Sequence, residues 1–490
     1  MRHIVYRFLA AISMIALVMM VTLVAPSAAA ATRPHYGGTL RVMMQSSPVA
    51  LDLPANATPA DYWGMARALS LIGDTLVKLD AQGQPHPALA VAWQSDATAQ
   101  HWHFTLRRGV KFHDGSAASS EAIAQILSTL HSGWIVRTSA DSLSIESETP
   151  MPSLLAELAL PRNLVLKRNA DGIPIGTGPF IVAEWQPAKL LKLAANEDSW
   201  EGRPFVDAVE IEFGKSLRDQ AVALELDKAD VIEAAPQAVS GPQRHGLAST
   251  SSSSSLLSLP VELLALVFPA NSKAQDPRIR EALELAIDRK PIQSVLLKGA
   301  GDPVGSILPN WMTGYSVVFS TQANPQRART LLADSRQPAL TLNYDPRDPQ
   351  AQLISERIAL NAREVGITVQ VSLSGAEDIR LVRVVLPSPD PAMSLAEVAR
   401  QLGLPQPALP AARGDSLDDL YQAEHGLLDG YAVIPLFHLP VATAASDRVR
   451  DRAANRRGEW TGGALTLADM WLENSAADSR ANSEPQAAPR

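Results

Sequence analysis

Residues 102–115 constrain the fold more than any other stretch of this 490-residue chain. From Trp102 to Leu106 apolar and polar side chains alternate, which is the two-residue period of a strand with one face in a core. An aspartate–glycine pair ends the stretch and predicts a turn, because glycine tolerates a positive φ. The apolar spacing within residues 121–130 predicts a helix after the turn. The stretch is therefore a β-ribbon that leads into a helix.

This stretch and several others resemble one known family. Residues 102–115 are Trp-His-Phe-Thr-Leu-Arg-Arg-Gly-Val-Lys-Phe-His-Asp-Gly. Residues 87–93 are Pro-Ala-Leu-Ala-Val-Ala-Trp, residues 175–180 are Ile-Gly-Thr-Gly-Pro-Phe, and residues 276–289 begin Asp-Pro-Arg-Ile-Arg and end Ala-Ile-Asp-Arg. Together they resemble the family 5 extracellular solute-binding proteins, which are the dipeptide, oligopeptide and nickel receptors of ABC importers. The resemblance implies a two-lobed α/β fold like that of type II periplasmic binding proteins, with mixed sheets and an additional subdomain in the first lobe.

The length also favours several lobes, because a single core stops growing at about 250–300 residues. By resemblance, residues 36–52, 171–262 and 443–474 form the main domain of lobe 1. Residues 53–170 form its subdomain, and residues 263–442 form lobe 2. The chain then crosses between the lobes twice, and these crossings are expected to form the hinge.

The periodicity predicts a parallel sheet in the second lobe. Residues 340–344, 351–365 and 367–371 predict a strand, a helix and a strand, with Gly366 ending the helix. Such a βαβ unit places its two strands parallel. The serine-rich residues 249–255 predict a solvated linker.

The N-terminus predicts a secretory signal peptide over residues 1–30. Basic residues precede an apolar run over 8–25, and small residues follow it up to Ala30, after which we expect cleavage. The alternative is an uncleaved anchor, because the apolar run approaches the length of a membrane span. Residues 475–490 predict a disordered tail.

The chain has no cysteine. Disulfides, thiol catalysis and a lipidated N-terminal cysteine are therefore excluded. Together with the signal peptide, this composition predicts a periplasmic protein that leaves by the Sec route and is not a lipoprotein.

The net charge of −8 disfavours nucleic acid or an anionic membrane surface as the main partner. No serine lies in a Gly-x-Ser-x-Gly elbow, and no nucleophile–base–acid set is evident, so an enzyme is the least favoured class and no cofactor is expected. Alternation places His101 and His103 on one face of a strand, with His113 nearby, but the wet face of a ribbon is favoured over a metal site there.

Six residues are predicted to contact a ligand between the lobes. Tyrosine and tryptophan on inter-lobe loops offer apolar area and one donor at low entropic cost, and Asp390 and His438 are at family motif positions on the inner edge of the second lobe. The six are Tyr62, Trp63, Trp311, Tyr315, Asp390 and His438. Core packing is the alternative role for each. Pro387 stands where peptide-binding relatives have an aspartate that pairs with the amino terminus of the ligand.

The resemblance implies a binding protein that captures a short peptide or other small polar solute by hinge closure. It would act as a monomer and deliver the solute to an inner-membrane ABC permease. The alternative is a trimmed relative that serves as a sensor or partner-binding module, because residues 131–174 and 372–430 are shorter than is usual in the family.

Overall fold

The computed structural model describes residues 34–53, 57–236, 248–250, 253–315, 318–333, 338–348, 350–373, 377–407, 417–451 and 467–473. The predicted signal peptide and the predicted C-terminal tail lie outside these ranges. The fold is that of the unit that begins at Tyr36. No helix in the described ranges combines the length and the apolar character that a membrane span requires.

Twelve strands of the described residues form one mixed sheet. In spatial order they are β10 (Phe180–Gln186), β11 (Leu190–Ala195), β12 (Ala208–Glu212), β1 (Thr39–Met43), β13 (Val231–Ala234), β20 (Val433–Ser446), β15 (Ser253–Val267), β19 (Ile379–Val385), β17 (Leu340–Tyr344) and β18 (Val369–Val371), with β14 (Ala248–Thr250) beside β15 and β16 (Asp302–Pro303) beside β20. We call the strands from β10 to β13 the β1 half, and β19, β17 and β18 the β17 half.

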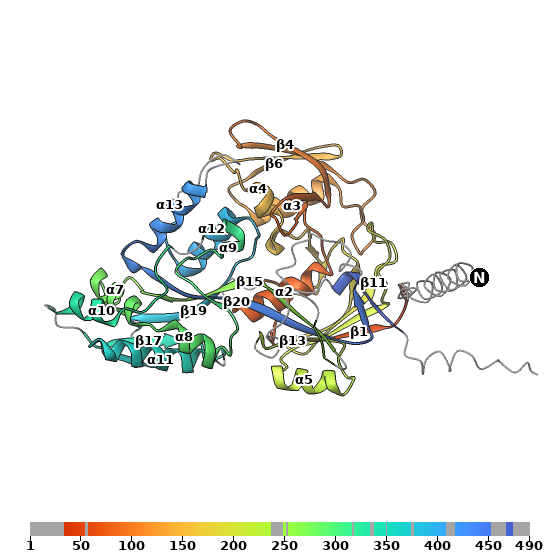
Figure 1. Ribbon diagram of the computed structural model, residues 1–490. Coiled ribbons are helices and arrows are strands. Elements are labelled where there is room, and N and C mark those ends of the chain that lie inside the picture. The colour runs from red at the N-terminus through yellow and green to blue at the C-terminus, as the bar shows by residue number, and fades with distance from the viewer. Residues whose placement is uncertain are drawn as a thin grey trace, which may run out of the picture. The chain divides into compact units, whose positions relative to one another are not determined.

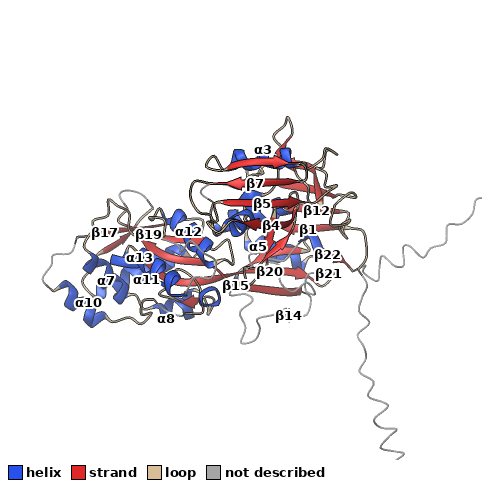
Figure 2. Ribbon diagram, turned by 90° about the horizontal axis from the view of Figure 1, so that it is seen from above, coloured by secondary structure: helices blue, strands red, loops and turns tan. Residues whose placement is uncertain are grey.

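Smaller sheets flank the large one. A four-stranded antiparallel sheet contains β4 (Ala90–Ser95), β5 (His101–Leu106), β7 (Ser142–Glu146) and β6 (Ile135–Ser139). Figure 2 shows β4, β5 and β7 side by side. Two-stranded pairs are β2 (Val77–Leu79) with β3 (Pro85–Pro87), β8 (Lys167–Arg168) with β9 (Pro174–Ile175), and β21 (Val449–Asp451) with β22 (Met470–Leu472).

Helices lie between these strands in the chain. They are α2 (Pro59–Ser70), α3 (Ser120–Leu130), α4 (Leu154–Leu158), α5 (Leu217–Glu225), α7 (Pro277–Ala286), α8 (Arg289–Pro291), α9 (Asn310–Thr313), α10 (Pro325–Leu332), α11 (Ala351–Glu364), α12 (Pro391–Leu402) and α13 (Leu417–Leu428). Short helical turns are η1 (Pro161–Asn163), η2 (Ile292–Leu296), η3 (Asp429–Tyr431) and η5 (Leu467–Asp469).

The β-ribbon expected at residues 102–115 packs as its alternation predicts. Trp102, Phe104 and Leu106 of β5 are buried, and they share a core with Ile123 and Leu127 of α3. The four-stranded sheet therefore has a hydrophobic core that is distinct from those of the large sheet.

Both faces of β15 are covered in the β17 half. Leu264 and Leu266 pack with α7, α10 and α11, while Leu263 and Ala265 pack with α12 and α13 on the opposite face. A continuous apolar run is what such a doubly covered strand requires. The predicted βαβ unit is β17, α11 and β18, and its strands pair in parallel.

Two long strands join the halves of the sheet (Figure 1). β20 pairs with β13 through Ala442–Ala445, and β15 pairs with β19 through Glu262–Val267. Between these segments Pro260 is the register partner of Pro440, and the register shifts on either side of Pro260. Proline has no N–H to donate to the ladder, so the ladder lacks two donors where the chain passes from one half to the other.

One local prediction is wrong. Residues 249–255 are expected to form a solvated linker or loop, but residues 248–250 form β14 and β15 begins at Ser253, while residues 251–252 lie outside the described residues. Serine is acceptable in a strand whose backbone groups are paired, and Ser253–Ser255 pair with Ala444–Ser446 of β20. The partner strand overrides the composition here.

Candidate functional site

A cavity of about 1840 Å³ lies where the two halves of the sheet meet. One wall comes from α2 and β13, which belong with the β1 half. The opposite wall comes from β19 and α12, together with the loop after β17. Any motion of one half against the other therefore changes the shape of this cavity.

The start of α2 positions the first aromatic residues of the wall. Thr58 caps the helix by accepting a hydrogen bond from the backbone N–H of Asp61 at 3.2 Å, and Pro59 occupies the first turn. This start places Tyr62 and Trp63 on the cavity. The Trp63 Nε1–H donates to Glu262 Oε1 of β15 at 3.2 Å.

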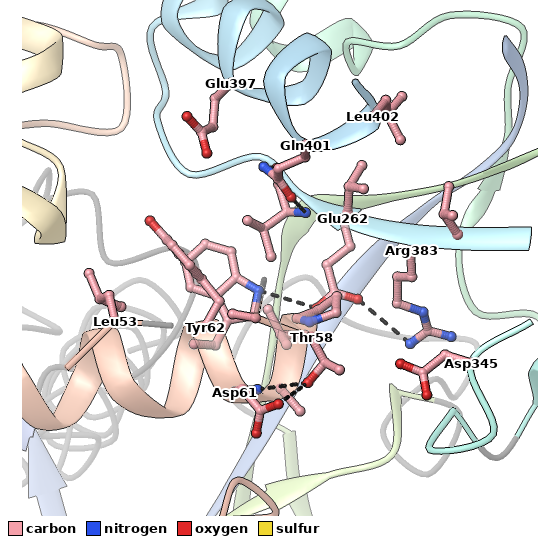
Figure 3. A pocket seen from close by; sticks show the side chains of 18 of the residues that line it. Leu53, Thr58, Asp61, Tyr62, Glu262, Asp345, Arg383, Glu397, Gln401 and Leu402 are labelled. Atoms are coloured by element: carbon pink, nitrogen blue, oxygen red, sulfur yellow. Dashed lines mark hydrogen bonds and ion pairs between the residues drawn. The ribbon is translucent and has the colours of Figure 1, made fainter. Parts of the chain in front are cut away.

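Glu262 is the centre of a buried polar cluster on the cavity wall. Figure 3 shows its side chain between α2, which carries Tyr62, and Arg383 of β19. Arg383 Nη1 lies 3.6 Å from Glu262 Oε2, and Arg383 Nη2 lies 2.9 Å from Asp348 Oδ2. Burial raises the pKa of Glu262 to about 7, and the nearby Arg383 acts in the opposite direction. This carboxyl therefore titrates near neutral pH.

A second ionic cluster bridges the cavity from η1 to α12. Arg162 Nη1 donates to Glu397 Oε2 at 2.8 Å, and Arg400 Nε donates to the same oxygen at 3.0 Å. Arg162 also pairs with Glu157 of α4. Burial alone would raise the pKa of Glu397, but Arg400 and Arg162 hold it below its ordinary value. The pair Arg162–Glu397 links two segments that are far apart in the sequence and that both line the cavity.

The lining as a whole carries both signs of charge, and no lysine. Six arginines line the cavity, namely Arg67, Arg162, Arg347, Arg380, Arg383 and Arg400. Eight carboxylates accompany them, namely Asp61, Glu157, Glu233, Glu262, Asp345, Asp348, Glu377 and Glu397. Such a surface is suited to a ligand that carries both charges.

Two of the six predicted ligand contacts, Tyr62 and Trp63, line the cavity. Trp311 lies nearby but outside the lining, where it packs with Trp63 and its Nε1–H donates to the carbonyl of Pro260 at 2.9 Å. Trp311 therefore contacts the strand crossing rather than the space between the halves.

The other three predicted contacts lie outside the lining as well. Tyr315 donates its hydroxyl to Glu424 Oε2 at 2.5 Å, and His438 Nε2 lies 2.9 Å from the carbonyl oxygen of Ile307. Burial lowers the pKa of His438 to about 4, so the ring is neutral at pH 7. Asp390 caps α12 by accepting the N–H of Met393 at 2.8 Å. Ligand contact by these residues stays a prediction.

The histidines considered for a metal site have other contacts. His101 Nδ1 lies 3.0 Å from Asp96 Oδ2, and His113 Nε2 lies 3.0 Å from the carbonyl of Gly178. Within the described ranges, no group of three or more His, Asp or Glu side chains is arranged to hold a metal ion.

Sequence analysis missed the charged residues of the cavity. Glu233, Glu262 and Arg383 each interrupt an apolar strand, at β13, β15 and β19. A charged side chain in a buried strand is uncommon unless it is paired or functional, and this signal was available. What the sequence alone could not show is that these three strands meet at one cavity.

A family model for bacterial extracellular solute-binding proteins, family 5, matches residues 84–380. The chain belongs to this family. The family assignment expected from the motifs at residues 87–93, 102–115 and 175–180 is confirmed.

Characterised family 5 members resemble the chain over most of its length. It is 25% identical over 352 residues to the nickel-binding periplasmic protein of Escherichia coli K12, which covers 64% of this chain and 67% of that protein. The chain is also 22% identical over 357 residues to di/tripeptide-binding protein 2 of Pseudomonas aeruginosa. This match covers 64% of this chain and 65% of that protein. The matches thus span about two thirds of the length of these relatives, and the relatives are binding proteins rather than enzymes.

Solved structures confirm the expected fold class. The structure of the PBP AgaA from A. tumefacien R10 in complex with agropinic acid superposes with a TM-score of 0.74 at 19% identity, covering 89% of this chain and 99% of that one. The fold is therefore the two-lobed type II periplasmic binding fold. We call the part that contains the β1 half lobe 1 and the part that contains the β17 half lobe 2. The predicted domain boundaries stay a prediction.

Proposed function

We propose that this family 5 protein is the periplasmic substrate-binding protein of an ABC importer. It captures a short peptide or another small polar solute between its lobes and delivers it to an inner-membrane permease. It acts as a monomer without a cofactor, and it performs no catalysis. Residues 1–30 are its Sec signal peptide.

The observation that carries this proposal is the mixed-charge cavity between the lobes. Its volume of about 1840 Å³ exceeds the roughly 300–1,000 Å³ of ordinary small-molecule sites. The space can therefore hold a ligand of several residues, or a smaller one together with ordered water. Six arginines and eight carboxylates on the walls suit the zwitterionic character of a peptide.

Hinge closure follows from the strand crossing. The ladder is interrupted at the Pro260–Pro440 pair, so the lobes can rotate there with little loss of hydrogen bonds. A ligand that contacts both walls stabilises the closed form, because it binds that form better than the open one.

A ligand screen tests the proposal. Dipeptides, tripeptides, opines, sugars and nickel complexes are added to the mature protein, and the melting temperature is measured. A ligand at 100 times its Kd adds about 2.7 kcal/mol to the free energy of unfolding. A true ligand should also reduce the radius of gyration in solution scattering and alter tryptophan fluorescence. The variant Trp63→Ala should lose these responses.

Failure of every solute to shift the melting temperature would contradict the transport proposal. A neighbouring sensor kinase gene, together with no ligand-induced compaction, would instead support the alternative of a sensor or partner-binding module.

A further inference from the structure

Several buried hydrogen-bonding groups of the cavity wall lack a hydrogen-bond partner. Among its described residues, five buried side-chain atoms have no hydrogen-bond partner: Ser46 Oγ, Arg67 Nε, Asn343 Oδ1, Arg380 Nε and Arg383 Nε. Three of the five are guanidinium donors. Leaving buried donors unsatisfied is costly, so a wall of this kind requires acceptors on a ligand or on ordered water.

Five of the six cavity arginines already have a carboxylate within 4.0 Å. Arg162 and Arg400 share Glu397, and Arg383 lies against Asp348 and Glu262. Arg347 lies 2.8 Å from Asp345, and Arg380 lies 3.8 Å from Glu377. The charge of each of these five is therefore at least partly balanced by the protein.

Arg67 is the exception. It lies in the last turn of α2 and lines the cavity, its buried Nε has no hydrogen-bond partner, and among the described residues no carboxylate forms an ion pair with it within 4.0 Å. Burial lowers its pKa, and the negative charge of Glu233 on β13 acts in the opposite direction without a direct contact. A partly buried cation with no direct partner is unfavourable in the empty protein.

The position of Arg67 in the last turn of α2 explains why a positive charge is favourable there. It does not explain why this side chain lines the cavity. A cation in the last turn interacts favourably with the helix dipole, an effect of about 0.3–1 kcal/mol at exposed sites. An arginine placed only for that purpose would extend into water. Arg67 instead faces a space bounded by both lobes.

We propose that Arg67 binds a carboxylate of the ligand, so that the cavity selects solutes with a free carboxylate. This inference rests on the proposed function and specifies the substrate class. The planar guanidinium matches a carboxylate with two parallel hydrogen bonds. The attraction strengthens as closure removes water from the site.

The remaining charges favour a carboxylate over a dianion. The lining has two more carboxylates than arginines. A phosphorylated ligand would add two further negative charges to a wall that is already acidic. A zwitterion places one carboxylate at Arg67 and leaves its ammonium group to the acidic side chains.

The test uses tri-alanine and its C-terminal amide with the full mature protein. Wild type, Arg67→Gln, Arg67→Met and the control Arg137→Gln are compared by calorimetry and thermal unfolding. Arg137 is an exposed residue of β6, paired with Glu146 of β7. Wild type and R137Q should bind the free acid at least tenfold more tightly than the amide, and R67Q should reduce this ratio to below threefold.

The same variants are also measured without ligand. If Arg67 exists for a ligand, R67M removes an unpaired buried charge and raises the melting temperature of the empty protein. If Arg67 is structural, R67M lowers it.

The outcomes separate this inference from the proposed function. Equal binding of acid and amide by wild type, or an unchanged ratio in R67Q, overturns the role of Arg67 while leaving peptide binding intact. If neither probe binds wild type, peptide capture fails. A more stable R67M would then still support an anion site, and a less stable R67M would overturn it.

Discussion

Pro260 and Pro440 are register partners at the point where β15 and β20 pass between the lobes. At this level neither residue can donate a backbone hydrogen bond, and Ser258 Oγ instead accepts the N–H of Val441 at 2.9 Å. A side chain thus replaces part of the ladder. The strands β15 and β20 therefore remain connected at the crossing, although two backbone donors are missing there.

Replacing both prolines by alanine should stiffen the hinge. The double variant P260A/P440A gains two N–H donors, each worth about 0.5–1.5 kcal/mol if a ladder bond forms. Ligand-induced closure, followed by stopped-flow tryptophan fluorescence, should slow severalfold while the melting temperature holds or rises. The matched control is Pro303→Ala, which changes a proline of β16 that pairs with Phe437 of β20. Unchanged closure rates would show that the prolines do not set the flexibility of the crossing.

The Arg162–Glu397 ion pair should stabilise the closed form. Glu397 is buried and the Arg162 side chain is 38% exposed, so the pair is intermediate between exposed pairs of about 0–1 kcal/mol and buried ones of about 3–5 kcal/mol. E397Q should therefore open the ligand-free protein, seen as a larger radius of gyration, and weaken ligand binding by about tenfold, or ~1.4 kcal/mol. The control R137Q removes an exposed pair within a single sheet and should have no effect. Identical scattering of E397Q and wild type would contradict a role of the Arg162–Glu397 ion pair in stabilising the closed form.

Glu262 should make the protein less stable as the pH rises. Its pKa is about 7 in the folded protein against an ordinary 4.5, so the unfolded chain loses this proton first. The contribution to stability is complete below pH 4.5 and is lost between pH 4.5 and 7, a change of roughly 3 kcal/mol at most. E262Q keeps an acceptor for Trp63 and should exceed wild type in urea stability at pH 8 but not at pH 4.5.

Glu356 provides the control for this measurement, since it is an exposed residue of α11. E356Q should follow the wild-type pH profile. A difference between E262Q and wild type that is the same at both pH values would rule out the titration of Glu262 as its cause.

His438 should act in the opposite direction over a similar range. Its pKa is lowered to about 4 from 6.5, so its contribution to stability is complete above pH 6.5 and is lost as the pH falls to 4. Glu262 and His438 therefore offset one another in the wild type. The E262Q variant should expose a steep loss of stability below pH 6.5, and adding His438→Gln should flatten it. A steep acid loss that persists in the double variant would contradict this assignment.

Substitutions of Tyr62 and Tyr315 should affect different properties, namely ligand affinity for Tyr62 and the free energy of unfolding for Tyr315. Tyr62→Phe removes a hydroxyl at the cavity and should weaken ligand binding with little change in melting temperature. Tyr315→Phe removes the donor to the buried Glu424 and should cost about 1–3 kcal/mol of stability while ligand affinity is kept. Calorimetry and urea unfolding of both variants measure the two effects. Loss of ligand affinity in Y315F at full stability would return Tyr315 to the binding site.

Local patterns predicted much of the fold. Alternation identified β5 and the spacing of apolar residues identified α3, because each element buries one face. The start of α7 is likewise set by sequence neighbours, because the Asp276 side chain accepts the N–H of Arg278 just before the helix. These features depend on neighbours in the sequence, so they are visible without the fold.

The site was harder to predict because its parts come from distant segments. Asp390 follows a strand and precedes a helix, and the sequence does not show that it caps α12 outside the lining of the cavity. Arg162 and Glu397 are 235 residues apart, so their contact follows only from the folded arrangement. Tyr62 and Trp63 were predicted because tyrosine and tryptophan on loops between the lobes suit a ligand site, and the structure places both in α2, where they line the cavity.

The length of β15 and β20 also affects how the protein comes apart. Ala445 of β20 belongs to the core of the β1 half, while Ile434 and Leu436 of the same strand belong to the core of the β17 half. If the sheet of one lobe unfolds, the sheet of the other lobe loses a strand that both lobes share. Heating should consequently melt both lobes in a single transition, although the proposed function requires them to move as separate bodies when a solute binds.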